Sequence, residues 1–68
     1  MIPNSLTDRC KPIDGQPVIW IWERAGQVTA GDYSEGCVRD ASKSYQIIDE
    51  GNLPSHWIYW PFQFINIH

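Results

Sequence analysis

The sequence predicts a mainly β domain: an antiparallel sheet of three to five short strands built on a central hairpin, with at most one or two helical turns. Apolar side chains alternate at two-residue spacing in residues 17–24, and Gly and Pro divide the chain into short segments. The chain is also rich in aromatic and β-branched residues, which suit strands. We expect a single domain over 1–68, with a turn-rich lead-in (1–16), the sheet (17–61) and an apolar C-terminal extension (62–68).

The clearest strand covers residues 17–24. In an extended chain its side chains alternate between two faces, and both faces are apolar, with Val18, Trp20 and Trp22 on one and Ile19 and Ile21 on the other. Apolar residues on both faces are typical of a central strand that is covered on each side.

A hairpin follows this strand. Ala25-Gly26 is expected to form its turn, residues 28–33 its return strand, and residues 34–36 a second turn. Because the return strand is less apolar than the first, we expect it to lie nearer an edge of the sheet.

The other segments give weaker patterns. Residues 40–43 fit a loop or one helical turn, residues 45–48 and 56–60 fit short strands, and residues 49–54 fit a loop. Residues 62–67 fit an edge strand or a packed tail. In the lead-in, Ser5 is expected to cap one helical turn that runs through Arg9.

Composition argues against several function classes. The net charge is −3 and shows no basic stripe, so we do not expect direct nucleic-acid binding. The sequence holds no long apolar run and no visible secretory signal, so we expect neither a membrane partner nor export. The expected location is the cytoplasm, where Cys10 and Cys37 would stay reduced, and a disulfide between them is the alternative.

Two sets of motifs resemble a known family. Near the start of the chain they are Asp8-Arg9, Pro12 and Asp14-Gly15-Gln16-Pro17-Val18, and near its end they are Ser55-His56-Trp57 and Pro61. Together they are similar to a small domain of unknown function that is common in tailed phages and prophages. The resemblance spans residues 5–61 and implies a phage context in the host cytoplasm, with no common activity. The motif residues are expected to have structural roles: Asp8, Arg9, Asp14, Gly15, Gln16, Val18, His56 and Trp57.

Candidate chemical sites are weak. Cys37 with His56 lacks any signature of a nucleophile and its base, and Cys10, Cys37, His56 and His68 lack the paired short spacing of zinc ligands. We therefore expect no enzyme activity, no metal and no cofactor. His56 is expected to bond a turn carbonyl while it packs beside Trp57, and the Asp8-Arg9 pair to brace the lead-in through charge-assisted bonds.

The expected function is therefore binding. Such a protein would dock on a host protein of the defence or transcription machinery and inhibit or redirect it by steric blocking. Exposed aromatic residues dominate binding surfaces, so the expected site comprises Trp60, Phe62, Phe64 and Tyr59, with Asp32 and Glu35. Five acids (Asp32, Glu35, Asp40, Asp49 and Glu50) fit either solvated turns or an acidic face that mimics nucleic acid. The alternative from a different class is a self-associating homodimer.

Overall fold

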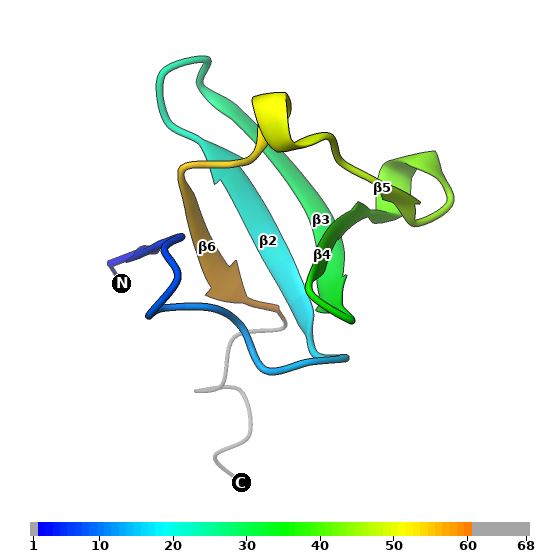
Figure 1. Cartoon of the computed structure of the whole chain (residues 1–68). Helices are drawn as coiled ribbons and strands as arrows, with labels where there is room; N and C mark the ends of the chain where they lie inside the picture. Colours follow the sequence, from blue (N-terminus) through cyan, green and yellow to red (C-terminus); the bar gives the residue numbers. More distant parts are fainter. Residues whose placement is uncertain (1, 61–68) are drawn as a thin grey trace, which may run out of the picture.

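The structure, a computed structural model, describes residues 2–60, which form one six-stranded antiparallel sheet with two short 3-10 turns. This confirms the predicted fold class. The strands lie in the order β1-β6-β2-β3-β4-β5 (Figure 1). Their bounds are β1 Asn4–Ser5, β2 Pro17–Trp22, β3 Gln27–Ser34, β4 Cys37–Asp40, β5 Gln46–Ile47 and β6 His56–Tyr59, with the turns η1 at Ala41–Lys43 and η2 at Glu50–Asn52. The prediction for residues 62–67 lies outside the described residues.

The predicted first strand is confirmed as β2, which ends two residues earlier than expected, at Trp22. It lies between β6 and β3 and so is central, as its two apolar faces indicated. The turn after it ends at Gly26, whose N–H donates to the Glu23 carbonyl at 3.2 Å and whose φ of 65° suits glycine.

The expectation that the return strand lies near an edge is wrong. Strand β3 is internal, because it pairs with β2 on one side and with β4 on the other. The low content of large apolar side chains in β3 therefore does not come from a position at the edge of the sheet. The Trp20 indole of β2 lies against Gly31 and reaches across it to β4, where Nε1 donates to the Arg39 carbonyl at 3.0 Å. One ring therefore supplies the apolar cover that β3 itself lacks.

A two-residue turn joins β3 to β4. Glu35 and Gly36 have φ values of 52° and 78°, and the flanking Ser34 and Cys37 form the last register pair. Two successive positive φ values define the hairpin turn whose twist matches that of the strands. The predicted turn at residues 34–36 is confirmed. The chain continues as β4, and residues 41–43 form the helical turn η1, one of the two alternatives expected for residues 40–43.

The prediction of a helical turn after Ser5 is wrong. Asn4 and Ser5 instead form β1, which pairs with Trp57 and His56 of β6. The Leu6 N–H donates to the Ser55 carbonyl at 3.0 Å, so the backbone is bound across the sheet rather than along a helix. The strands expected at residues 45–48 and 56–60 are confirmed as the shorter β5 and β6. The two strands that were not expected, β1 and β4, bring the sheet to six strands instead of three to five.

The core lies on one face of the sheet. Val18, Trp20, Val38 and Trp57 are each 4% exposed or less, and they come from β2, β4 and β6. The lead-in and the segment after β5 both pass over this face (Figure 1). They contribute Leu6, Cys10 and Ile48, which pack against the four core residues.

Candidate functional site: the open face of the sheet

The opposite face of the sheet carries the candidate site, which we call the open face. Strand register places on it every second residue of β2, β3, β4 and β6, alternating with the core residues. The Trp60 N–H donates to the Pro17 carbonyl at 3.0 Å, which continues the β2–β6 pairing by one residue. The open face therefore comprises twelve residues: Pro17, Ile19, Ile21, Val28, Ala30, Asp32, Ser34, Cys37, Arg39, His56, Ile58 and Trp60.

The centre of the open face is apolar and partly accessible. Ile19 is paired with Ala30 on one side and with Ile58 on the other, so three aliphatic side chains form a row across the sheet. These central residues are partly exposed, while Val28 is 60% exposed and Trp60 is 48% exposed. The prediction that β2 is covered on each side thus differs from the structure of residues 2–60, where the lead-in and the segment after β5 pack on the core face.

A bidentate ion pair borders this apolar row. The Arg39 guanidinium donates to the Asp32 carboxylate through Nε at 2.7 Å and through Nη2 at 2.6 Å, between residues that are register partners in β4 and β3. Arg39 also lies over the Tyr45 ring, 5.3 Å from its centroid. The hydrogen bond to Asp32 raises the pKa of Arg39 above its ordinary value. The two charges therefore neutralise each other on the open face.

The predicted binding residues are separated by the fold. Trp60 and Asp32 share the open face. Tyr59 points to the core face, where its ring packs edge-on against Trp57 at 4.9 Å and its hydroxyl accepts a hydrogen bond from the Ile13 N–H at 3.0 Å. Glu35 is exposed in the β3–β4 turn, while Phe62 and Phe64 lie outside the described residues.

Sequence reasoning did not assign binding to the aliphatic residues Ile19, Ile21, Val28 and Ile58. A signal for them was present, because the alternation placed apolar residues on a second face of β2. The predicted elements, however, included no amphipathic helix of sufficient length to cover that face.

The Asp14-Gly15-Gln16 motif connects the lead-in to the β3–β4 turn. An Asp14 carboxylate oxygen accepts a hydrogen bond from the Glu35 N–H at 2.7 Å, and the Gly15 N–H donates to the Tyr33 carbonyl at 2.7 Å. The Gln16 N–H closes a turn onto the Ile13 carbonyl at 3.1 Å. These bonds give the motif a structural role.

The other motif residues also hold the fold. Val18 is completely buried, and Trp57 Nε1 donates to the Cys10 carbonyl at 3.1 Å, which anchors the lead-in over the core. His56 differs from both parts of its expectation. Nδ1 contacts the Ser55 hydroxyl at 2.8 Å instead of a turn carbonyl, and strand alternation places its side chain on the open face, opposite the core residue Trp57. That hydroxyl in turn donates to the Ile21 carbonyl at 3.1 Å.

Asp8 and Arg9 form the exposed two-residue turn between Thr7 and Cys10. A neutral contact braces this turn, since the Arg9 N–H donates to the Thr7 hydroxyl at 3.3 Å. The expected charge-assisted bonds from the two side chains are not found in residues 2–60.

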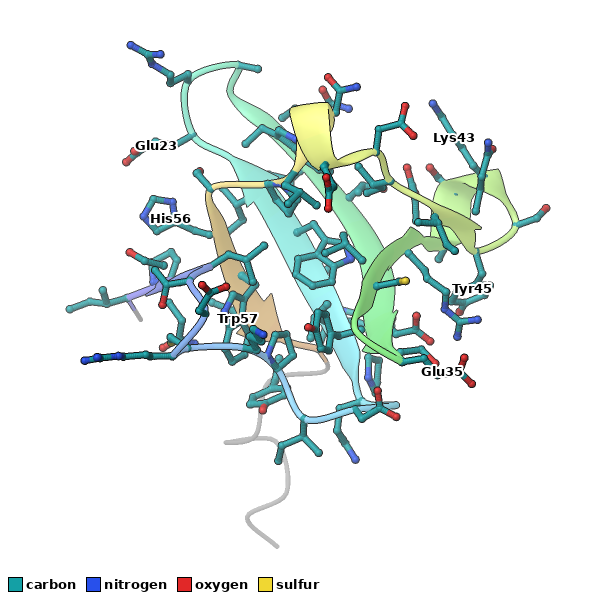
Figure 2. The ribbon with its side chains drawn as sticks, viewed as in Figure 1. Glu23, Glu35, Lys43, Tyr45, His56 and Trp57 are labelled. Atoms are coloured by element: carbon teal, nitrogen blue, oxygen red, sulfur yellow. The ribbon has the colours of Figure 1, made fainter. Side chains whose placement is uncertain are left out.

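Cys37 and His56, considered above as a nucleophile and its base, are not brought together by the fold. Cys37 begins β4, whereas His56 begins β6, and β2 and β3 lie between these strands. They also lie near opposite ends of the sheet, as Figure 2 shows for His56 and for Glu35, which precedes Cys37 by two residues. Cys10 and Cys37 are unpaired thiols. Within residues 2–60, no three His, Cys, Asp or Glu side chains are grouped so that they could hold a metal ion.

Two of the five acids have internal partners. Asp32 pairs with Arg39, and Asp40 is only 8% exposed, where its carboxylate accepts hydrogen bonds from Ser42 N–H, Ser42 Oγ and Thr29 Oγ1 at 2.9, 2.6 and 3.1 Å. Burial opposes ionisation of Asp40, but these hydrogen bonds and Lys43 together lower its pKa below the ordinary value. Glu35, Asp49 and Glu50 are exposed, as expected of acids in turns.

A cleft opens on the core face, between the lead-in and the segment after β5. Its volume is about 370 Å³, its floor includes Tyr33 and Val38, and its rim carries charges of both signs from Asp8, Lys11 and Glu50. A mixed rim of exposed charges gives this cleft no clear preference for a ligand.

The fold and its surface define a small single-sheet β domain with an open apolar face. No family model matches this chain, and neither a curated protein nor a solved structure does. The resemblance to the phage family stays a prediction. Among the described residues, no helix is long and apolar enough to cross a membrane.

Proposed function

We propose that this chain is a non-enzymatic binding protein that docks through its open face on an apolar surface of another protein. One observation carries the proposal: an aliphatic row on a central part of the sheet, around Ile19, has no second layer over it within residues 2–60. A sheet normally buries its apolar face against another layer. Contiguous exposed apolar surface is accordingly typical of interaction sites.

The composition of the open face supports docking on a protein. Trp60 lies at its edge and Arg39 beside its aliphatic centre, and Trp and Arg are enriched among residues that dominate binding energies. The Asp32 carboxylate already binds Arg39, so the Arg39 guanidinium is ordered before a partner binds. Ordered side chains lose less conformational entropy on binding.

The motif resemblance supports a phage context, in which the partner is a host protein of the defence or transcription machinery and the action is steric. The alternative of an acidic nucleic-acid mimic has less support. Asp32 and Asp40, two of its five acids, use their carboxylates in bonds within the fold and are not free to imitate phosphates.

Affinity capture from a host lysate, with matched variants, tests this proposal. Val28→Lys places a charge on the open face at a side chain that is already 60% exposed, whereas Ile13→Lys makes the same kind of change at a side chain that is 64% exposed in the lead-in. Trp60→Ala is a third variant, which removes the exposed ring from the open face. We expect all three variants to fold, and only Val28→Lys and Trp60→Ala to release the captured protein. If the open-face variants retained the same protein as fully as the wild type, the proposal would be wrong.

A further inference from the structure

We infer that a second copy of this chain occupies the open face in the free protein, so that two sheets stack face to face as a two-fold symmetric sandwich. The inference rests on the proposed function and adds regulation of the same site. Two copies protect the face from solvent until a target replaces one of them.

The charge on the open face favours a second copy over a strongly charged partner. The chain carries a net charge of −3, so two copies repel each other over most of their surfaces. On the open face, however, Asp32 and Arg39 form a closed ion pair, with both guanidinium bonds at 2.7 Å or less. A face that is neutral overall can meet its own copy without the repulsion that the rest of the surface would cause.

The shape of the side chains also favours stacking. The row of Ala30, Ile19 and Ile58 places a small residue beside two β-branched ones, on a pleated surface. Stacked sheets pack about 10 Å apart by interdigitating such side chains. In a two-fold dimer the same patch serves both copies, so a row lying near the symmetry axis would contact itself.

The accessible surface of the chain is large enough to supply a dimer interface. A standard interface buries about 800 Å² on each partner. The accessible surface of the chain is 4997 Å², so such an interface would take about one sixth of it. One broad face of a single-sheet domain can supply that share.

The small core explains why association with a second copy would stabilise the domain. Within residues 2–60 the hydrophobic core comprises four buried residues, Val18, Trp20, Val38 and Trp57, and only the first two are completely buried. Domains of this size bury a smaller fraction of their surface than larger ones and often gain stability by association. Dimerisation would cover Ile19, Ile21 and Ile58 and so give the sheet an apolar layer on both faces.

Sedimentation equilibrium over a concentration series tests the inference. We expect the wild-type protein to form a dimer that dissociates on dilution. Val28→Lys and Ile19→Lys should weaken the association at least about tenfold, because each buries a charge between the sheets. Ile13→Lys should leave it unchanged. Circular dichroism checks that each variant is folded, and Val28→Lys keeps the test valid if Ile19→Lys unfolds the sheet.

Isotope-filtered nuclear Overhauser spectra on a mixture of labelled and unlabelled wild-type chains give a second readout. We expect methyl contacts of Ile19 and Ile58 with the other copy. A wild-type protein that remains monomeric at about 1 mM would overturn the inference. So would a dimer that Val28→Lys leaves intact, because its interface would lie elsewhere.

The two proposals fail in different ways. A strict monomer whose capture of a target is abolished by Val28→Lys would refute self-association and leave the docking function standing. A dimer that is lost in Val28→Lys, while target capture is unaffected, would refute the docking function and leave self-association standing. If both proposals hold, adding the purified target to the dimer should produce free chains and a one-to-one complex.

Discussion

The indole Nε1 of Trp20 donates a hydrogen bond to the main-chain carbonyl of Arg39 at 3.0 Å, which joins β2 to β4 across the strand between them. Gly31 of β3 lies beneath this bond, and a methyl group added there would stand 2.7 Å from Trp20 Nε1 and closer still to the Arg39 carbonyl. No atom of an ordinary side chain fits into that space. The absence of a side chain at Gly31 therefore allows the buried indole of Trp20 to link β2 to β4 across β3.

Gly31→Ala is therefore expected to lower the free energy of unfolding by about 2–3 kcal/mol, because either the indole or the carbonyl must move. Urea titration followed by tryptophan fluorescence measures this change. Gly51→Ala is the matched control, since nothing lies within 4 Å of a methyl group added there. Equal stability of the two variants would show that the Trp20 bridge tolerates displacement.

Asp14→Ala is expected to destabilise the β3–β4 turn. The carboxylate accepts a hydrogen bond from the Glu35 N–H at 2.7 Å, and loss of such a bond costs about 1 kcal/mol. Asp49→Ala is the control, because Asp49 precedes η2 without a side-chain capping bond. Thermal unfolding should therefore separate the two variants, and faster amide exchange at Glu35 in Asp14→Ala should locate the effect. Unchanged exchange at Glu35 would contradict this role for Asp14.

Tyr59→Phe is expected to loosen the lead-in without disturbing the core. It removes the hydroxyl that accepts the Ile13 N–H at 3.0 Å and keeps the ring that packs against Trp57. We expect a loss of about 1 kcal/mol and faster amide exchange at Ile13. Target capture should persist, because Tyr59 faces away from the open face. Loss of capture in a folded Tyr59→Phe protein would place Tyr59 in the binding site after all.

Asp40 should make stability depend on pH in the acidic range. Its pKa in the folded protein is lowered from 3.8 by hydrogen bonds from Ser42 and Thr29, so the folded state binds its proton less readily than the unfolded state. The stability that this residue contributes is therefore fully present above pH 5 and is lost as the pH falls through the folded pKa. Asp40→Asn should be less stable than the wild type at pH 7 and should show a smaller loss between pH 5 and pH 2. Parallel pH profiles for the two proteins would rule out this role.

Local patterns in the sequence predicted the parts of the fold that depend on neighbouring residues. The alternation of Pro17–Trp22 identified the central strand, and glycines identified both hairpin turns. Strand β1 was missed because Asn4 and Ser5 carry no periodic signal, and their pairing partner β6 is some fifty residues away. The position of β3 was wrong because the apolar cover on Gly31 comes from Trp20, a residue of another strand.

The candidate site was predicted only in part. The sequence indicated Trp60 and Asp32, and both lie on the open face. It did not indicate the aliphatic row, since whether Ile19 and Ile58 are core or surface depends on which face the lead-in and the later loop cover. That choice is made by long-range contacts such as the one between Trp57 and the Cys10 carbonyl.

The position of β6 has a consequence for synthesis in the cell. The last strand of the described sheet is inserted between β1 and β2, so the two parts of the sheet are joined only after His56–Tyr59 has been made. Folds that depend on such distant pairings form slowly. A nascent chain halted before this strand would hold a β2–β3–β4 meander without Trp57 over its core, and would be a natural substrate for chaperones.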